Sequence, residues 1–210
     1  MTVHLVRHGE TSSYDSDAGL TPRGVAQAET WATAFAAELD GAHVAFGYAP
    51  TARAYETALA IQRIVRPHGR CVELAAFRNL QVLVDGMEFE PTQVRQRAMT
   101  EDRGWAVEAR RFWQAHERGD AMRFWLTTPL LWHESPAAVV RRFLTAVIDH
   151  DESDHLVVAT HSGCLRAIVA WAKGSDPGEP DNAESVSLRR TGDHVEIRCR
   201  GEEFRCELPS

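Results

Sequence analysis

The order of predicted elements indicates an α/β fold, a three-layer α/β/α sandwich around a mostly parallel central sheet. Apolar runs of strand length and segments of helical periodicity alternate along most of the 210 residues, which is typical of parallel sheets covered by helices. The run at 155–160 is apolar almost throughout, as expected for a strand buried on both faces. This length suggests a single domain over 1–210, and residues 77–134, where the alternation is lost, suggest a helical insertion over one end of the sheet.

The first elements follow directly from the start of the chain. Residues 2–6 predict a short apolar strand, and the polar residues 9–20 predict a loop. Thr21 and Pro22 predict a helix that continues to about residue 39, because threonine suits the N-cap and proline the first helical position. The next elements are a strand at 43–49, a helix at 51–65 ended by Pro67 and Gly69, and a short strand at 71–74.

The insertion and the second half are predicted in the same way. Residues 93–116 indicate one charged helix, and the aromatic side chains that crowd 112–132 favour a satellite core, with a substrate pocket as the alternative. Ser135 and Pro136 start a helix to about residue 150. After the strand at 155–160, we expect a helix at 163–173, a loop at 176–182, a hairpin of 185–189 with 194–198, and either an edge strand or a loose end at 201–210.

Composition excludes several classes of function. The 30 acidic residues outnumber the 23 basic ones, which argues against a general nucleic-acid binder. No stretch approaches the roughly 20 apolar residues of a membrane helix, and the N-terminal residues lack the apolar core of a signal peptide. We therefore expect a cytoplasmic protein without nucleic-acid or membrane partners. The four cysteines match no zinc pattern and are expected to be reduced, structural thiols.

Residues suited to anion chemistry follow three of the predicted strands. Arg7 and His8 end the first strand, His161 ends the strand at 155–160, and Arg53 begins a helix after the second strand. Ligands of open α/β sheets lie beyond the carboxyl ends of the strands, so these side chains are expected to meet. Arginine presents a planar fork of donors that matches phosphate oxygens. The sequence therefore predicts a phosphate site.

The same segments supply a nucleophile and backbone donors. A neutral imidazole nitrogen of His8 can attack phosphorus and form a covalent intermediate. Gly9 allows the backbone to approach closely beside it. Ser162 and Gly163 open a helix, whose free N–H groups favour an anion.

The segments that carry these residues resemble those of the histidine phosphatase superfamily, branch 1, which includes the phosphoglycerate mutases. The similar segments occur in family order between about residues 3 and 189. They are 5–11, with its Arg-His-Gly-Glu-Thr run, 20–28, 50–58, Glu134-Ser135 followed by Arg141, 160–163, and 182–188.

This resemblance implies a phosphoglycerate mutase-like fold and a phosphatase of the histidine acid phosphatase type. It implies that His8 becomes phosphorylated, while Arg7, Arg53 and His161 bind the phosphoryl oxygens, with Thr11, Ser162 and Gly163 as further phosphate-binding residues. No metal or other cofactor is expected, because the cationic side chains stabilise the charge themselves. The expected partners are a small phosphorylated substrate and inorganic phosphate as product, and the expected assembly is a monomer or a homodimer.

The general acid is the point at which the sequence departs from the family. The family usually supplies a glutamate where this chain has Asn79 or Gln81, and neither side chain can exchange a proton usefully. The carboxylates that follow are Asp85, Glu88 and Glu90. We expect Glu88 to be the acid, with Asp85 as the alternative, unless the acid is absent.

Three functions remain open at this point. The first is a phosphomonoesterase that acts through phosphohistidine. The second is a phosphoglycerate-type mutase, which would need further basic residues near 77–90 that the sequence lacks. The third is a module that binds phosphate or a phosphoprotein with little turnover, if the acid is lost.

Overall fold

The computed structural model describes residues 1–14, 16–66, 68, 70–150 and 153–208. Seven strands form one sheet in the order β3-β2-β6-β1-β7-β8-β9, of which β3, β2, β6 and β1 are mutually parallel and the last three antiparallel. The strands are β1 (Thr2–Arg7), β2 (Val44–Tyr48), β3 (Cys71–Glu73), β6 (His155–Thr160), β7 (Ser185–Thr191), β8 (His194–Cys199) and β9 (Glu202–Glu207). The predicted α/β fold is thereby confirmed.

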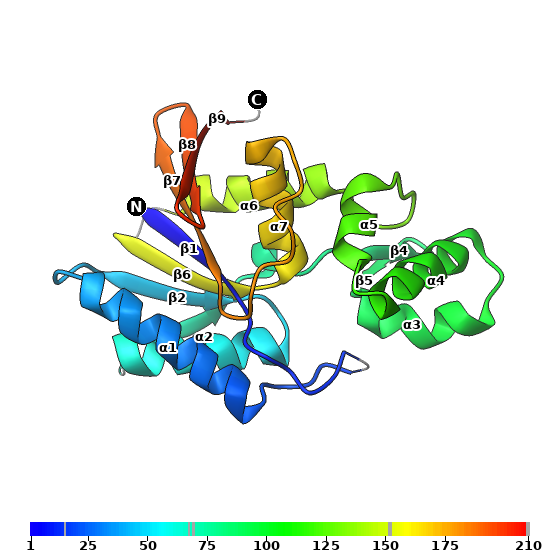
Figure 1. Ribbon diagram of the computed structural model, residues 1–210, viewed down its shortest axis with the longest axis horizontal. Coiled ribbons are helices and arrows are strands. Elements are labelled where there is room, and N and C mark those ends of the chain that lie inside the picture. The colour runs from blue at the N-terminus through cyan, green and yellow to red at the C-terminus, as the bar shows by residue number, and fades with distance from the viewer. Residues whose placement is uncertain (15, 67, 69, 151–152, 209–210) are drawn as a thin grey trace.

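Helices cover both faces of the sheet (Figure 1). They are α1 (Pro22–Glu38) and α2 (Ala52–Val65) on one face, and α6 (Pro136–Asp149) and α7 (Ser162–Lys173) on the other. Alternate residues of β1 explain this arrangement, since Val3 and Leu5 pack with α6 and α7 while Val6 packs with α1 and α2.

The helix starts agree with the predicted caps. The hydroxyls of Thr21, Thr51 and Ser135 each accept a hydrogen bond from the backbone N–H three residues later. Each cap fixes where its helix begins, and with it the residues that follow the preceding strand. Pro67 and Gly69, predicted to end α2, lie outside the described residues, as do the last two residues of the predicted C-terminal edge strand, which is β9.

The residues between β3 and α6 form a cap that lies beside the sheet (Figure 1). It contains a 3-10 turn η1 (Ala75–Phe77), a hairpin of β4 (Val82–Val84) and β5 (Met87–Phe89), and the helices α3 (Pro91–Thr100), α4 (Gly104–Glu117) and α5 (Ala121–Thr127). Helix α5 packs on α7 and so joins the cap to the core.

The prediction of one helix over 93–116 is wrong, because the chain reverses between α3 and α4. Gly104 starts α4 beneath the ring of Trp132, where a Cβ would lie 2.3 Å from the nearest ring carbon. This close contact lets Trp105 and Trp132 pack with β4 and α3 in a separate small core. The sequence predicts a satellite core of aromatic residues. Trp132 packs in this small core, whereas Phe112, Trp113 and Trp125 extend the main core.

No helix in the described part of the chain combines the length and apolar character that crossing a bilayer requires.

Candidate functional site

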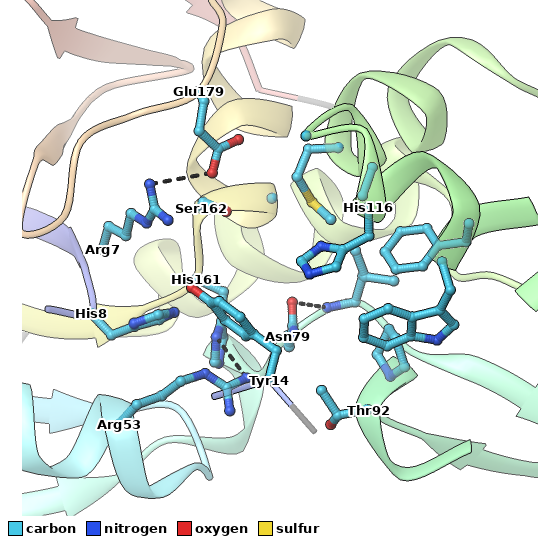
Figure 2. Close-up of a pocket in the computed structure, with 18 residues that line it drawn as sticks. Arg7, His8, Tyr14, Arg53, Asn79, Thr92, His116, His161, Ser162 and Glu179 are labelled. Carbon is cyan, nitrogen blue, oxygen red and sulfur yellow. Dashed lines mark hydrogen bonds and ion pairs between the residues drawn. The ribbon is translucent and has the colours of Figure 1, made fainter. Parts of the chain in front are cut away.

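A cavity of about 270 Å³ lies between the carboxyl ends of the strands and the cap (Figure 2). The sheet brings the residues that follow β1 and β6 together, because Arg7 and Thr160 are register partners on these adjacent strands. His8 and His161 follow them directly, and their rings meet edge to face with centroids 5.5 Å apart. The cavity is lined by Arg7, His8, Tyr14, Arg53, Asn79, Leu80, Pro91, Thr92, Phe112, Trp113, His116, Gly119, Ala121, Met122, His161, Ser162, Gly163 and Glu179.

The position of His8 determines which of its ring nitrogens is reactive. Its Nδ1 lies 2.8 Å from the carbonyl oxygen of Gly9. A carbonyl only accepts hydrogen bonds, so Nδ1 carries the proton and Nε2 keeps its lone pair. Burial, reinforced by the nearby Arg53 cation, lowers the pKa of His8 to about 3. At neutral pH the ring is therefore uncharged and able to act as a nucleophile.

The backbone around His8 is fixed by close contacts. A Cβ on Gly9 would lie 2.3 Å from the carbonyl oxygen of Gly24 at the start of α1, so only glycine fits there. The N–H of Gly9 donates to Oγ1 of Thr57, and the side-chain amide of Asn182 donates to the His8 carbonyl. The backbone at His8 is therefore held by contacts from α1, from α2 and from the loop before β7.

His161 carries its proton on the opposite nitrogen. Its Nδ1 lies 3.4 Å from Nη2 of Arg53, and because a guanidinium only donates, Nδ1 is the acceptor and Nε2 carries the hydrogen. Burial, followed by the charge of Arg53, lowers the pKa of His161 well below its usual value. His161 is thus a neutral donor that has the reverse tautomer of His8.

Arg53 is almost completely buried, and its guanidinium contacts three side chains. Its guanidinium lies 3.3 Å from Asp17 Oδ1 and 3.4 Å from both carboxylate oxygens of Glu90, in addition to His161. Asp17 also accepts the backbone N–H of Ala52 at the start of α2. The arginine is therefore held in one orientation, with its charge facing the cavity (Figure 2).

Arg7 supplies the second cation, on the side of the cavity next to the loop before β7. Its Nη1 donates to the carbonyl of Pro180 and lies 3.2 Å from Glu179. Glu179 also pairs with Arg166, a residue of α7 whose guanidinium binds Asp176.

Several buried donors of this site have no acceptor among the described residues. They are Nε of Arg7, Nε of Arg53 and Nε2 of His161. Buried polar groups without partners are costly, so a ligand rich in acceptors would be favoured here. The first N–H groups of α7, at Ser162 and Gly163, add the positive end of a helix dipole beside the cavity. The arrangement suits a tetrahedral oxyanion.

The structure brings together most of the residues predicted for the site, but not Thr11. Arg7, His8, Arg53, His161, Ser162 and Gly163 all line the cavity. The hydroxyl of Thr11 instead donates into its own loop, at 2.9 Å from the carbonyl oxygen of Gly19. Tyr14 from that loop lies in the cavity, and no motif in the sequence pointed to it.

Neither of the two predicted acids lies in the cavity. The side chain of Glu88 is 59 % exposed on β5 and pairs with Arg78 at 2.9 Å. Asp85 stands at the tip of the β4–β5 hairpin, 50 % exposed, and pairs with Arg103 at 2.6 Å. The expectation that Glu88 or Asp85 lies at the site is wrong, because the β4–β5 hairpin turns both side chains towards the outside of the cap.

Glu90 is the carboxylate that the fold places beside His161, although it lines the neighbouring cavity next to Asp17 and not this one. It immediately precedes α3, its side chain is 14 % exposed, and its Oε1 lies 4.0 Å from Nε2 of His161. Its backbone N–H donates to Gln93 and its carboxylate accepts from Thr92, so the start of α3 fixes it. The sequence signal for this position is the pair Glu90-Pro91, because a proline at the first helical position marks the preceding residue as the N-cap.

The two amides at the family's usual acid position are also separated by the fold. Asn79 lines the cavity, and its Oδ1 accepts the N–H of Leu80. Gln81 is buried away from the cavity and donates to the Asn79 carbonyl. Behind these amides, Glu134 pairs with Arg142 at 2.8 Å. Arg142 also binds the carbonyls of Ala76 and Arg78, and so supports the segment that carries Asn79.

Comparison with known families agrees with this site. A sequence description of the histidine phosphatase superfamily (branch 1) matches residues 3–208. Comparison with curated proteins finds no match.

Several solved structures share the fold at low sequence identity. YhfR from Bacillus stearothermophilus has a TM-score of 0.62 at 22 % identity, with 96 % of each chain covered. A mycobacterial glucosyl-3-phosphoglycerate phosphatase complexed with VO3 has a TM-score of 0.60 at 18 % identity, covering 94 % of this chain and 96 % of that one. A putative alpha-ribazole-5'-P phosphatase from Escherichia coli has a TM-score of 0.56 at 18 % identity, covering 100 % and 96 %.

Proposed function

The chain belongs to the histidine phosphatase superfamily, branch 1, and on that basis we propose that it is a phosphomonoesterase acting through a phosphohistidine. Its substrate is a small phosphorylated molecule, and inorganic phosphate is one product. The observation that carries the proposal is the hydrogen bond from His8 Nδ1 to the Gly9 carbonyl. This bond leaves an uncharged Nε2 beside two arginines and a neutral histidine donor.

The first step transfers the phosphoryl group to the enzyme. The lone pair of His8 Nε2 forms the bond to phosphorus, and the bond from phosphorus to the ester oxygen breaks. Arg7, Arg53 and the Nε2–H of His161 donate to the phosphoryl oxygens and stabilise the charge that spreads over them. The departing alkoxide oxygen takes a proton from an acid, and the alcohol leaves.

Glu90 is the group that we assign as this acid. Its carboxylate lies 4.0 Å from the His161 nitrogen that would donate to a phosphoryl oxygen. A carboxyl group next to a phosphoryl oxygen is also within reach of an ester oxygen on the same phosphorus. Glu88 and Asp85 are occupied by arginines on the outside of the cap. Glu90 therefore replaces the family's usual glutamate from a different position in the chain.

The second step reverses the proton transfer. A water molecule enters where the alcohol left, Glu90 accepts one of its protons, and the new oxygen–phosphorus bond forms as the bond to His8 Nε2 breaks. Phosphate leaves, and His8 returns to its uncharged form with Nδ1 still bonded to Gly9. Glu90 is again protonated for the next cycle, so protons balance over the two steps.

The alternatives have less support from the cavity. A phosphoglycerate-type mutase needs cations for a second anionic group of a bound intermediate. Among the described lining residues, Arg7 and Arg53 are the arginines and there is no lysine, and we assign both arginines to the single phosphate. A binding module without turnover needs no acid, whereas Glu90 is held beside His161 in this chain.

The test is to trap the covalent intermediate. The protein is incubated with phenyl phosphate labelled on phosphorus, without added metal, and then denatured in base, where phosphohistidine survives and phosphoserine does not. We expect release of phosphate and a base-stable label that is absent from His8→Ala and present in His43→Ala, a variant of an exposed histidine. Label that persists in His8→Ala would refute the role of His8, and binding of phosphate without any turnover would favour the binding module.

A further inference from the structure

Beyond its phosphate-binding end, the cavity is lined mostly by apolar side chains, with Asn79, Thr92 and His116 as polar residues among them. Its wall opposite the sheet comes from the cap and from the segment after η1 (Figure 2). The apolar side chains that line it are Leu80, Pro91, Phe112, Trp113, Ala121 and Met122. These residues would surround whatever group is attached to the phosphate.

Met122 brings this apolar surface directly against the phosphate end. A Cβ on Gly163 would lie 2.5 Å from the sulfur of Met122, so the methionine packs on the first turn of α7. The apolar wall therefore begins at Gly163, the second residue of α7, whose N-terminus lies beside the proposed phosphate position.

Aromatic rings continue the surface from the nucleophile to the cap. Tyr14 lies 6.2 Å from His8 between ring centroids, and 5.7 Å from His116, edge to face. His116 in turn meets Trp113 edge to face at 5.0 Å. A flat or short apolar group would be enclosed by these rings on one side and by Met122 on the other.

The charges around the cavity exclude a second anionic group on the substrate. Arg7 and Arg53 are used by the phosphate, and Glu179 adds a carboxylate at the rim. Arg95 of the cap stacks on Trp113 with its charge 4.5 Å from the ring centroid and pairs with Glu117, and it is not a lining residue. A carboxylate or second phosphate would thus lose its hydration without gaining a cation.

Cavity size restricts the substrate further. Small-molecule sites commonly enclose about 300–1,000 Å³, and this cavity, at about 270 Å³, is slightly smaller than that range. The space suits a phosphoryl group joined to a single ring or a short chain.

Resting on the proposed phosphatase function, we infer that this enzyme selects small phosphate monoesters of apolar alcohols that carry no second anionic group. This preference differs from the substrate in the name of the mycobacterial neighbour, since glucosyl-3-phosphoglycerate contains a carboxylate and a sugar. The apolar wall recognises the alcohol, and the absence of a third lining arginine or lysine among the described residues leaves an anionic alcohol without a cation to pair with.

The test compares three esters of primary alcohols, so that their leaving groups have similar chemistry. They are benzyl phosphate, glycerol 3-phosphate and benzyl phosphate with a carboxylate in the para position. We expect kcat/KM for benzyl phosphate to exceed each of the others at least tenfold. Equal or higher kcat/KM for either polar ester would overturn the inference while leaving the phosphatase intact. If even phenyl phosphate gives no turnover and no label on His8, the proposed function itself fails, and the inference with it.

A pair of methionine variants tests whether the wall is responsible. Met122→Gln keeps the side-chain length but adds an amide to the wall, and Met99→Gln makes the same change at an exposed site on α3. We expect Met122→Gln to lower the ratio of kcat/KM for benzyl phosphate over glycerol 3-phosphate about tenfold, mainly through KM. Met99→Gln is expected to leave that ratio unchanged. An unaltered ratio in a folded Met122→Gln protein would remove the wall from substrate selection.

Discussion

Nη2 of Arg53 lies 3.4 Å from Nδ1 of His161, and this contact decides which nitrogen of His161 is a donor. Because the guanidinium cannot accept a hydrogen bond, it forces the imidazole proton onto Nε2. The hydrogen bond between Nδ1 of His8 and the Gly9 carbonyl has the opposite result. The two adjacent strands thus present one histidine with a free lone pair on Nε2 and the other with an N–H on Nε2.

Replacing Arg53 by lysine tests this relationship. Lysine keeps the positive charge but loses the planar fork that reaches Asp17, Glu90 and His161 together. We expect kcat/KM for phenyl phosphate to fall about 100-fold or more, the usual cost of removing one oriented transition-state donor. Arg63→Lys, at an exposed position on the same helix, serves as the control and is expected to be unchanged. A loss of less than about threefold in Arg53→Lys would show that charge alone is sufficient.

Glu90→Gln separates proton transfer from binding. The amide keeps an oxygen that can accept from Arg53 but cannot supply a proton. Phenolate leaves readily without protonation, whereas an alkoxide does not, so benzyl phosphate is expected to slow at least tenfold more than phenyl phosphate during phosphorylation of His8 in single-turnover assays. Glu88→Gln and Asp85→Asn make the same chemical change on the outside of the cap and are expected to leave both rates unchanged. Equal slowing of the two esters in Glu90→Gln would mean that Glu90 only positions Arg53.

The ionisation of His8 can be followed directly by NMR. Because burial and Arg53 lower the pKa of His8 to about 3, its ring stays uncharged at every pH well above that value. The ring carbon signal assigned by comparison with His8→Ala is therefore expected to keep its position between pH 8 and pH 5. A midpoint near 6.5 would contradict the buried, uncharged nucleophile described above.

Stability is expected to fall in acid partly because of His4, a half-buried histidine on β1. Burial and the neighbouring His155 lower the pKa of His4 to about 4. The unfolded chain, in which this pKa is about 6.5, binds more protons between pH 6.5 and pH 4, so the free energy of unfolding falls as the pH drops through that window. His4 alone contributes on the order of 3 kcal/mol to this loss. Urea titrations at pH 7, 5.5 and 4.5 are expected to show a smaller decline in His4→Gln, and an identical decline would exclude His4 as its source.

The arrangement of the sheet and the phosphate site could be predicted because each depends on short-range signals. Thr21, Thr51 and Ser135 mark helix starts through their own side chains. His8 and His161 are each one residue beyond a strand, so the parallel pairing of those strands is enough to bring them together.

The cap could not be predicted, because long-range packing determines it. The reversal before α4 depends on the contact between Gly104 and Trp132, 28 residues apart in the printed sequence. The direction in which Asp85 and Glu88 point depends on the β4–β5 hairpin, which is only three residue pairs long. Glu90 lies two residues from Glu88, yet of these two only Glu90 pairs with Arg53, since the end of the hairpin turns the chain into α3 between them.

The attachment of Glu90 to the cap has a consequence for the order in which activity is lost. His8 and His161 are anchored to central strands and keep their spacing as long as the sheet exists, whereas Glu90 depends on a peripheral unit joined to the core through α5 and α7. Partial detachment of that unit, under mild denaturant for instance, would leave a protein that still takes up a phosphoryl group from a reactive ester. Such a protein would release the group slowly, and it would accumulate in the phosphorylated state before it unfolds.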